Sequence, residues 1–312
     1  MLYLALAVAC SLAIGMIFKY AGRRRMDRIA LLTVNYAAAV ATAGVLLAAG
    51  GREVQAGLAM DASLLTLGVL TGALLIAGFF VLMVATDVAG MSLALGVMRV
   101  SVVIPFVLSW WIWDEIPSAA QVIGLVVASV AFFLIARKEQ EPVPQQAAVP
   151  ATAGAGGAPP EPSPSPDVSW KAFGVLALLF CSGGAVDVTM KTFEEGFAAA
   201  NSRVLFLLLA FGVAFLIGFA WVLWKGISEG RWPENDTIGW GIGLGIINYG
   251  SLEFILRAIN QLPGTFVFPV NNIAIVVLAA GLGVYVWGER LSRLNKIGLG
   301  LAVIALILLN IR

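Results

Sequence analysis

Ten long apolar runs are the feature that most constrains how this chain can fold. Each is close to the roughly 20 residues that an α-helix needs to cross a bilayer. They are continuous rather than alternating, which excludes membrane-spanning strands. The runs lie at residues 2–18, 29–49, 63–85, 91–113, 118–136, 172–190, 203–224, 237–259, 265–287 and 293–311. We therefore predict an all-α integral membrane protein with ten transmembrane helices.

Composition excludes several classes of site. Only 12% of the 312 residues are charged, whereas soluble domains carry about 25%. Histidine is absent, and Cys10 and Cys181 both fall inside apolar runs, so we expect no metal site and no disulfide. Basic residues lie between the runs, which argues against a nucleic-acid partner. An intramembrane enzyme would need a nucleophile–base pair, paired aspartates or a metal within the membrane. We expect no enzymatic activity and no cofactor.

One connection differs from the other, short ones. Residues 138–169 are rich in Pro, Ala, Gly and Ser and contain no aromatic side chain. Such a segment cannot bury enough apolar area to offset its ordering entropy, so we predict a disordered, passive linker. It separates a first five-helix unit, residues 1–137, from a second, residues 170–312.

The two units resemble each other. A shift of 174 residues aligns them without a gap over 113–134, where nine of 22 positions are identical. These pairs are Trp113/Trp287, Glu115/Glu289, Ser118/Ser292, Ile123/Ile297, Gly124/Gly298, Leu125/Leu299, Ala128/Ala302, Ala131/Ala305 and Leu134/Leu308. Because each unit has an odd number of spans, the second enters the membrane from the opposite side. We therefore predict two inverted repeats around a central cavity.

The basic residues predict an orientation. Thirteen lysines and arginines lie on the side of the first loop and the linker, and five lie on the other side. Cytoplasmic loops carry the excess of Lys and Arg. We expect a cytoplasmic linker and both termini outside, in the cytoplasmic membrane of a bacterium or archaeon.

The two units end in similar phrases. Trp-Asp-Glu-Ile-Pro-Ser at 113–118 precedes Ile123-Gly124, and Trp-Gly-Glu-Arg-Leu-Ser at 287–292 precedes Ile297-Gly298-Leu299-Gly300. This pattern resembles the EamA-type repeat of the drug/metabolite transporter superfamily. The resemblance implies ten helices and transport of a small metabolite. It leaves open whether the substrate is an amino acid, a sugar, a nucleotide sugar or a drug.

A narrower likeness concerns residues 189–197, Thr-Met-Lys-Thr-Phe-Glu-Glu-Gly-Phe. They are similar to the end of the first helix in small multidrug transporters of the same superfamily. Those proteins carry a membrane-embedded glutamate about two turns before that lysine. Here Gly183 holds the position, and Ser11 corresponds to it in the first unit. Proton/drug exchange centred on that glutamate therefore does not carry over.

Four charges fall inside predicted spans, where charge is costly and commonly functional: Arg99, Asp187, Glu253 and Arg257. Glu253 and Arg257 share a helix face, either as a self-neutralised pair or as a functional one. Arg99 has no acidic residue within helical reach. We expect it in the cavity wall, with a buried salt bridge to Asp187 or Glu253 as the alternative. Asp187 lies near the end of its predicted span, which favours an interfacial carboxylate over a cavity role. Both carboxylates are candidates for a coupling proton.

Two prolines and several asparagines also lie inside predicted spans, as the four charges do. Pro105 and Pro269 lack the backbone donor, so we predict kinks that interrupt the fourth and ninth spans. Irregular backbone at membrane depth is tolerated against protein or a water-filled cavity. For each amide, a helix–helix hydrogen bond is the alternative role. The further candidate cavity residues are Asn271, Asn272, Asn248, Tyr249 and Asn35.

Glycine pairs indicate close helix packing. Gly68 with Gly72, and Gly241 with Gly245, are small residues four apart, a spacing that lets backbones approach closely. No phosphate-binding lysine follows them, so a nucleotide site is not expected.

Taken with these residues, the leading hypothesis is a secondary transporter that moves a small metabolite by alternating access. One arginine and one or two carboxylates in a cavity suit a zwitterion such as an amino acid. The alternatives are an exporter of cationic or hydrophobic drugs and a non-transporting receptor or scaffold with the same fold. We expect a monomer or weak dimer in the lipid bilayer.

Overall fold

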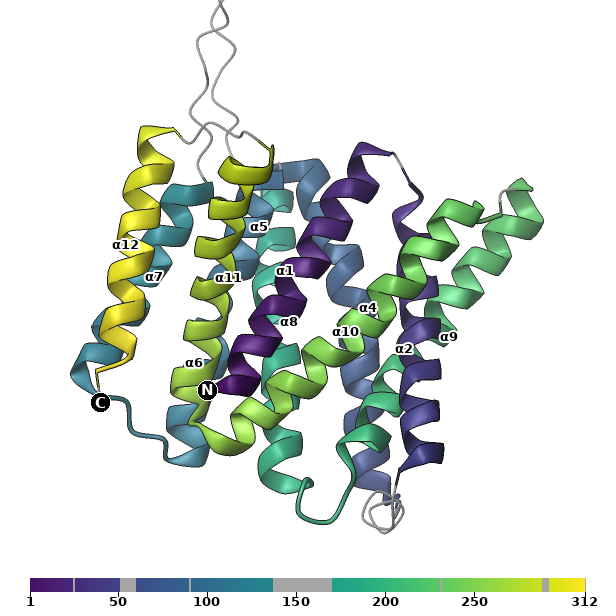
Figure 1. Cartoon of the computed structure of the whole chain (residues 1–312), viewed down its shortest axis with the longest axis horizontal. Helices are drawn as coiled ribbons and strands as arrows, with labels where there is room; N and C mark the ends of the chain where they lie inside the picture. The colour runs from purple at the N-terminus through teal and green to yellow at the C-terminus, as the bar shows by residue number, and fades with distance from the viewer. Residues whose placement is uncertain are drawn as a thin grey trace, which may run out of the picture.

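The chain folds as a bundle of α-helices (Figure 1). The computed structural model describes residues 1–24, 26–50, 60–89, 91–136, 170–230, 232–287 and 292–311, and these residues form no strand. Eight helices in this part of the chain are long and apolar enough to cross a membrane. The predicted all-α membrane class is therefore confirmed. The predicted linker, 138–169, lies outside the described residues.

The helices follow the predicted runs in order. Their bounds are α1 Leu2–Arg23, α2 Arg28–Ala49, α4 Ala62–Ala89, α5 Met91–Val100, α6 Val103–Trp113, α7 Ala119–Ala136, α8 Trp170–Gly196, α9 Arg203–Glu229, α10 Asn235–Gln261, α11 Gly264–Trp287 and α12 Arg293–Leu309. α5 and α6 together occupy the fourth predicted span. α12 has 17 residues, about 25 Å at 1.5 Å per residue, slightly less than the roughly 30 Å hydrocarbon core.

The bundle has two distinct ends. We call the linker face the end at which α7 finishes and α8 begins, and the terminal face the opposite end, where α1 begins and α12 finishes. The turns between α1 and α2 and between α9 and α10 lie at the linker face (Figure 1). The α6–α7, α8–α9 and α10–α11 connections lie at the terminal face. Both termini therefore lie toward one face.

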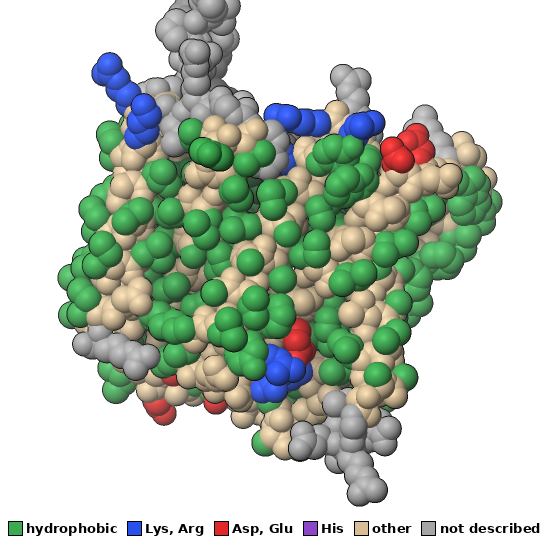
Figure 2. Space-filling model, viewed as in Figure 1, with side chains coloured by type: hydrophobic (Ala, Val, Ile, Leu, Met, Phe, Trp, Pro, Cys, Tyr) green, Lys and Arg blue, Asp and Glu red, His purple; other side chains and the backbone are tan. Residues whose placement is uncertain are grey.

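Apolar side chains cover the flank of the bundle, and Lys and Arg side chains gather along the linker face (Figure 2). Large hydrophobic residues such as Val45, Leu216 and Ile307 are more than 60% exposed. An apolar flank between charged ends is what a bilayer requires, because lipid tails solvate the flank and water solvates the ends.

The contacts between helices show which of them surround the middle of the bundle. α7 packs on α12 at one edge of the bundle and α2 packs on α9 at the other (Figure 1). Between them, α10 contacts α1 and α2, while α4 contacts α8 and α9. α1 also contacts α11, and α8 contacts α5 and α6. Helices from both units thus surround the middle of the bundle.

The predicted glycine contacts are confirmed. A Cβ added to Gly72 of α4 would lie 2.3 Å from the carbonyl oxygen of Ala210 in α9. A Cβ added to Gly245 of α10 would lie 2.3 Å from the carbonyl oxygen of Asn35 in α2. Only glycine fits where two helix backbones approach this closely.

Replacing Gly245 with Ala should therefore destabilise the bundle. The added methyl group cannot avoid the α2 backbone, and overpacking of this kind costs about 1–3 kcal/mol. The matched control is Gly239→Ala in the same helix, where nothing lies within 4 Å of the added Cβ and alanine is the better helix former. Thermal unfolding of the purified variants in detergent tests this. Equal melting temperatures for the two variants would contradict the close contact.

At the linker face, Asp27 caps α2 and joins it to α9. Its carboxylate accepts hydrogen bonds from the amides of Ile29 at 2.9 Å and Ala30 at 3.2 Å, and from Lys225 Nζ at 2.7 Å. Partial burial acts to raise the pKa of Asp27, but the Lys225 and amide hydrogen bonds outweigh it and hold the pKa below its usual value. The capped, ionised carboxylate fixes the start of α2.

Candidate functional site

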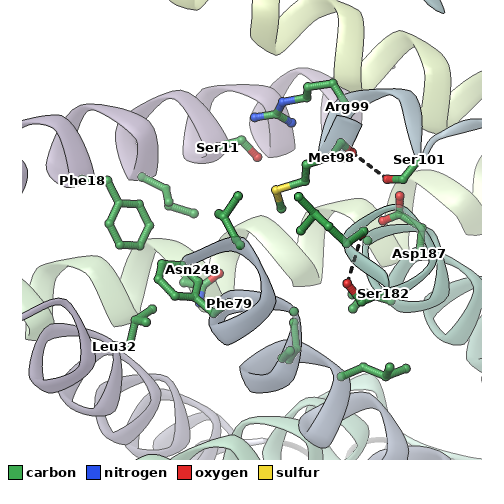
Figure 3. A pocket seen from close by; sticks show the side chains of 18 of the residues that line it. Ser11, Phe18, Leu32, Phe79, Met98, Arg99, Ser101, Ser182, Asp187 and Asn248 are labelled. Atoms are coloured by element: carbon green, nitrogen blue, oxygen red, sulfur yellow. Dashed lines mark hydrogen bonds between the residues drawn. The ribbon is translucent and has the colours of Figure 1, made fainter. Parts of the chain in front are cut away.

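A cavity of about 320 Å³ lies in the middle of the bundle (Figure 3). Its walls come from α1, α2, α4, α5, α8, α10 and α11, so both units contribute. Six of the residues expected there from the sequence do line it: Asn35, Arg99, Asp187, Asn248, Asn271 and Asn272.

The break between α5 and α6 places Arg99 at this cavity. Pro105 has no amide proton, so the carbonyl of Ser101 lacks its helical partner; it accepts instead from the amide of Ile104 at 3.0 Å. The Ser101 hydroxyl donates to the carbonyl of Met98 at 2.6 Å. Arg99 thus stands in the last turn of α5, where the helix dipole favours a cation. The predicted interruption of the fourth span is confirmed.

The prediction that the helix is interrupted at Pro269 in the ninth span is wrong. α11 continues without interruption through Pro269, from Gly264 to Trp287. Pro269 is the sixth residue of this helix, so the amide proton that it lacks is the one that would reach the carbonyl of Thr265. The proline therefore removes a single hydrogen bond, which the helix tolerates.

Arg99 of α5 is held by an amide of α11. Its Nη1 donates to Oδ1 of Asn272 at 3.1 Å. Nδ2 of Asn272 donates to the carbonyl of Phe268 one turn earlier, also at 3.1 Å. Because the amide nitrogen is used in α11, the amide oxygen must face Arg99. This fixes the guanidinium while leaving its other donors available to a ligand.

Asp187 supplies the opposite charge. α8 runs to Gly196, so Asp187 lies inside the helix rather than at its end. It lines the cavity with Arg99, and each charge acts on the other. Among the described residues the two form no direct salt bridge. An anion and a cation on one wall, unjoined, can each receive a ligand group.

The amides of α2 and α10 join across the cavity. Nδ2 of Asn248 donates to Oδ1 of Asn35 at 3.2 Å, which is the helix–helix bond named as the alternative role. Both residues nevertheless line the cavity. Asn271 differs, since its Oδ1 is buried and accepts no hydrogen bond from the described part of the chain. A buried acceptor without a partner costs free energy unless water or a ligand satisfies it.

Two expected residues do not line this cavity: Tyr249 and Glu253. Glu253 accepts from Arg257 Nε at 2.7 Å, which matches the self-neutralised alternative. The reason is helical geometry. Successive residues are about 100° apart around a helix, so Tyr249 and Glu253 point well away from the direction of Asn248.

The cavity has a polar part and an apolar part. Arg99, Ser101 and Asp187 lie together at one side in Figure 3, whereas Phe18 and Phe79 lie at the other. The two phenylalanine rings are 5.5 Å apart, centre to centre. The site can therefore take a molecule that is charged at one end and apolar at the other.

Sequence reasoning missed several residues at and near the site. Ser11 lines the cavity and pairs with Ser251, hydroxyl to hydroxyl, at 3.1 Å. Ser182 lines it too. A separate group of buried charges, centred on Lys191, lies at the terminal face. The sequence signals were the i,i+4 spacing of Lys191 and Glu195 and the likeness of residues 189–197; Glu115, the cross-unit partner of Lys191, is distant in sequence.

Comparisons with known proteins find similar proteins by sequence and by structure. No protein-family model matches the chain. An uncharacterised protein of Haemophilus influenzae is 26% identical over 307 residues, which cover 95% of this chain and 93% of that protein. A solved crystal structure of another protein shares the fold with a TM-score of 0.71 and 14% sequence identity, covering 99% of this chain and 96% of that chain. The arrangement of both units is thus found in a known structure over almost its whole length.

Proposed function

We propose that this protein is a secondary transporter that moves a small, amino-acid-like zwitterion across the membrane by alternating access. The observation that carries the proposal is the pair Arg99 and Asp187. The two opposite charges face one central cavity inside an apolar bundle without a direct salt bridge. Charge at this depth is costly unless it serves a pathway. A ligand carboxylate would meet Arg99 and a ligand ammonium would meet Asp187.

The proposed architecture is two inverted five-helix repeats of the drug/metabolite transporter, EamA type. Contacts of equivalent glycines support it. Gly124 of α7 approaches the carbonyl of Ala305 in α12, and Gly298 of α12 approaches the carbonyl of Ala131 in α7. Both pairs, Gly124/Gly298 and Ala131/Ala305, have the 174-residue offset found in the sequence.

A second reciprocal contact supports the same architecture. A Cβ added to Gly72 would contact Ala210 and Val213 of α9. A Cβ added to Gly245 would contact Asn35 and Ala38 of α2. Asn35/Ala210 and Ala38/Val213 share one offset, 175 residues. Each unit therefore presents the same surface to the other, which is what a two-fold relation requires. Binding between inverted repeats and at a broken helix is the common design of secondary transporters.

Substrate charge separates the alternatives. The two charged residues that line the cavity are one cation and one anion, so its formal charge is balanced. A cationic drug would favour an excess of carboxylates, although the apolar side with Phe18 and Phe79 would accept its rings. A receptor or scaffold would gain nothing from an unsatisfied Asn271 amide oxygen. A zwitterion with an apolar side chain fits all three features.

Asp187 is the proposed carboxylate for a coupling proton. It is the only acidic residue among the cavity-lining set. Glu253, the other candidate, is already paired with Arg257 and does not line the cavity. A proton on Asp187 would change the charge that a substrate meets there.

The proposed orientation places the linker face in the cytoplasm and both termini outside, with the protein a monomer or weak dimer in a bacterial or archaeal cytoplasmic membrane. The gathering of Lys and Arg along the linker face supports it. A reporter that works only outside the cytoplasm should be active when it is fused after Arg312. A signal from a reporter that works only in the cytoplasm would reverse the orientation.

A ligand screen tests the proposed function. Purified protein is heated with amino acids, sugars and cationic drugs, and amino acids should raise the melting temperature by mass action. Asn271→Ala should lose this shift, whereas Glu253→Gln, outside the cavity, should keep it. Stabilisation by cationic drugs alone would favour the drug-exporter alternative. No stabilisation by any solute class would contradict a small-molecule site.

A further inference from the structure

Buried charges gather at the terminal face, away from the cavity. Lys191, near the end of α8, is 1% exposed. Its ammonium pairs with Glu115 from the α6–α7 connection and with Glu195 of its own helix, the latter at 2.5 Å. It also lies 5.8 Å from the centre of the Trp113 ring. A lysine this deeply buried marks a tightly packed point of the structure.

Glu115 joins three elements. α6 ends at Asp114 in a left-handed conformation, φ 52°, and the next amide, that of Glu115, donates back to the carbonyl of Ser109 at 3.3 Å. One carboxylate oxygen of Glu115 accepts from Lys191 in α8. The other accepts from the backbone amide of Thr265, in the first turn of α11, at 3.0 Å. The side chain therefore ties the first unit to two helices of the second.

The start of α11 leaves no space at this point. A Cβ added to Gly264 would lie 2.4 Å from the Ser109 hydroxyl and 3.3 Å from the Glu115 carboxylate. Nearby, Glu194 of α8 holds Arg203 of α9 in a two-pronged pair at 2.5 and 2.8 Å. These charged contacts thus join the end of α6 with α8, α9 and α11 at the terminal face. We call them the charged layer.

A buried apolar layer accompanies these charges. Phe193 of α8 and Phe206 of α9 are fully buried and stacked, with ring centres 4.2 Å apart. The cavity residues of α1, α2 and α4 lie mostly between the middle of each helix and its linker-face end, whereas Asp187 of α8 and Asn272 of α11 lie in the terminal-face halves of theirs. In α8, the buried Lys191 and Glu194 follow Asp187, so the charged layer lies between the polar side of the cavity and the terminal face.

We infer that the tie from Lys191 through Glu115 to the Thr265 amide is the lock that keeps the cavity closed at the terminal face. The inference rests on the proposed alternating access, in which this face must open in turn. A buried ion pair suits a reversible lock, because water that enters on opening replaces much of what the pair loses. Breaking the tie in one partner shifts the population toward the state open at that face.

Glu115→Gln tests the lock, with Glu195→Gln as the matched control. Both variants remove one carboxylate from Lys191, but Glu195 lies in the same helix as the lysine and forms no ion pair or hydrogen bond with another helix in the described part of the chain. Glu115→Gln also keeps an oxygen that can accept from the Thr265 amide, so the fold should persist. Lys191→Met is the second variant, and it breaks the tie from the other side.

Access is measured with a single cysteine in the cavity. Cys10 and Cys181 are changed to serine and Ser182 to cysteine; the Ser182 hydroxyl bonds only within α8, to the carbonyl of Leu179. A membrane-impermeant thiol reagent is then applied to right-side-out and inverted vesicles. The parent should react from the linker side. Glu115→Gln and Lys191→Met should react about five- to thirty-fold faster from the terminal side, and Glu195→Gln should behave as the parent.

The outcomes separate the lock from the proposed function. Equal terminal-side labelling of Glu115→Gln, Lys191→Met and the parent would overturn the lock, as would an equal rise in Glu195→Gln. Because labelling needs no substrate, a parent that exchanges amino acids while its variants fail to shift access would contradict the lock alone. A shift in access without any exchange would contradict the proposed transport and leave the lock in place.

Discussion

Replacing Arg99 with Ala should lower affinity for the stabilising amino acid by about 10- to 100-fold. Hydrogen bonds to charged groups contribute about 1.5–3 kcal/mol, and the guanidinium is the one cation among the cavity-lining residues. Its position is fixed by the bond to Asn272, so little ordering cost is left for the ligand to meet. Ligand titrations of the melting temperature or of binding heat measure the change.

Arg99→Lys is the control for geometry. The ammonium keeps the charge but loses the planar fork that can face Asn272 and a carboxylate at once. We therefore expect an affinity between those of Arg99→Ala and the parent. Unchanged affinity in Arg99→Ala, for every amino acid that stabilises the parent, would remove the zwitterion proposal.

Neutralising both charges should separate stability from transport. Asp187→Asn alone leaves Arg99 without its opposite charge in the cavity, and this should cost less than the roughly 3–5 kcal/mol lost when a direct buried ion pair is broken, because the two residues form no salt bridge. The double variant Arg99→Gln with Asp187→Asn removes both charges, so its thermal stability should recover most of that loss. Transport should stay at least about 10-fold below the parent, because a tenfold change corresponds to only 1.4 kcal/mol of lost substrate contact. Thermal unfolding and solute uptake are measured on the parent, on Arg99→Gln and Asp187→Asn singly, and on the double variant.

The result for the double variant decides what the pair is for. Two residues that only neutralise each other show strong coupling in a double-mutant cycle, and the double variant regains function. Two residues that each hold a substrate group do not. Full recovery of transport in the double variant would show a structural pair and contradict the proposed site.

The apolar runs predicted the helices well, but their ends less well. Hydropathy places the end of the sixth span at 190, whereas α8 continues to Gly196. Lys191 and Glu194 are polar by composition, yet both are buried because Glu115 and Arg203 neutralise them. The predicted span therefore ends six residues before α8 does, and Asp187 lies further from the helix end than from the end of the predicted span. Partners distant in sequence decide such ends, and a single sequence does not display them.

The position of a residue along its helix was predicted more reliably than the side of the helix on which it lies. Asn248 and Tyr249 were both expected in the cavity, but only Asn248 lines it. The polar residues of α10, at 248, 249, 251 and 253, lie on more than one side of the helix, so they form no single polar stripe that would reveal its inner face. Arg99, Asn271 and Asn272 were predicted correctly as cavity-lining residues because charge or paired amides at mid-membrane have few other places to lie.

Exchange across a membrane of defined composition tests the central claim most directly. Purified protein is reconstituted into liposomes loaded with the unlabelled amino acid that gives the largest thermal shift, and the same amino acid, labelled, is added outside. A transporter with one central site should accumulate label transiently above equilibrium, and Arg99→Ala liposomes should resemble empty ones. Parent liposomes that take up no more label than empty ones, with protein that still binds the amino acid, would contradict transport by alternating access.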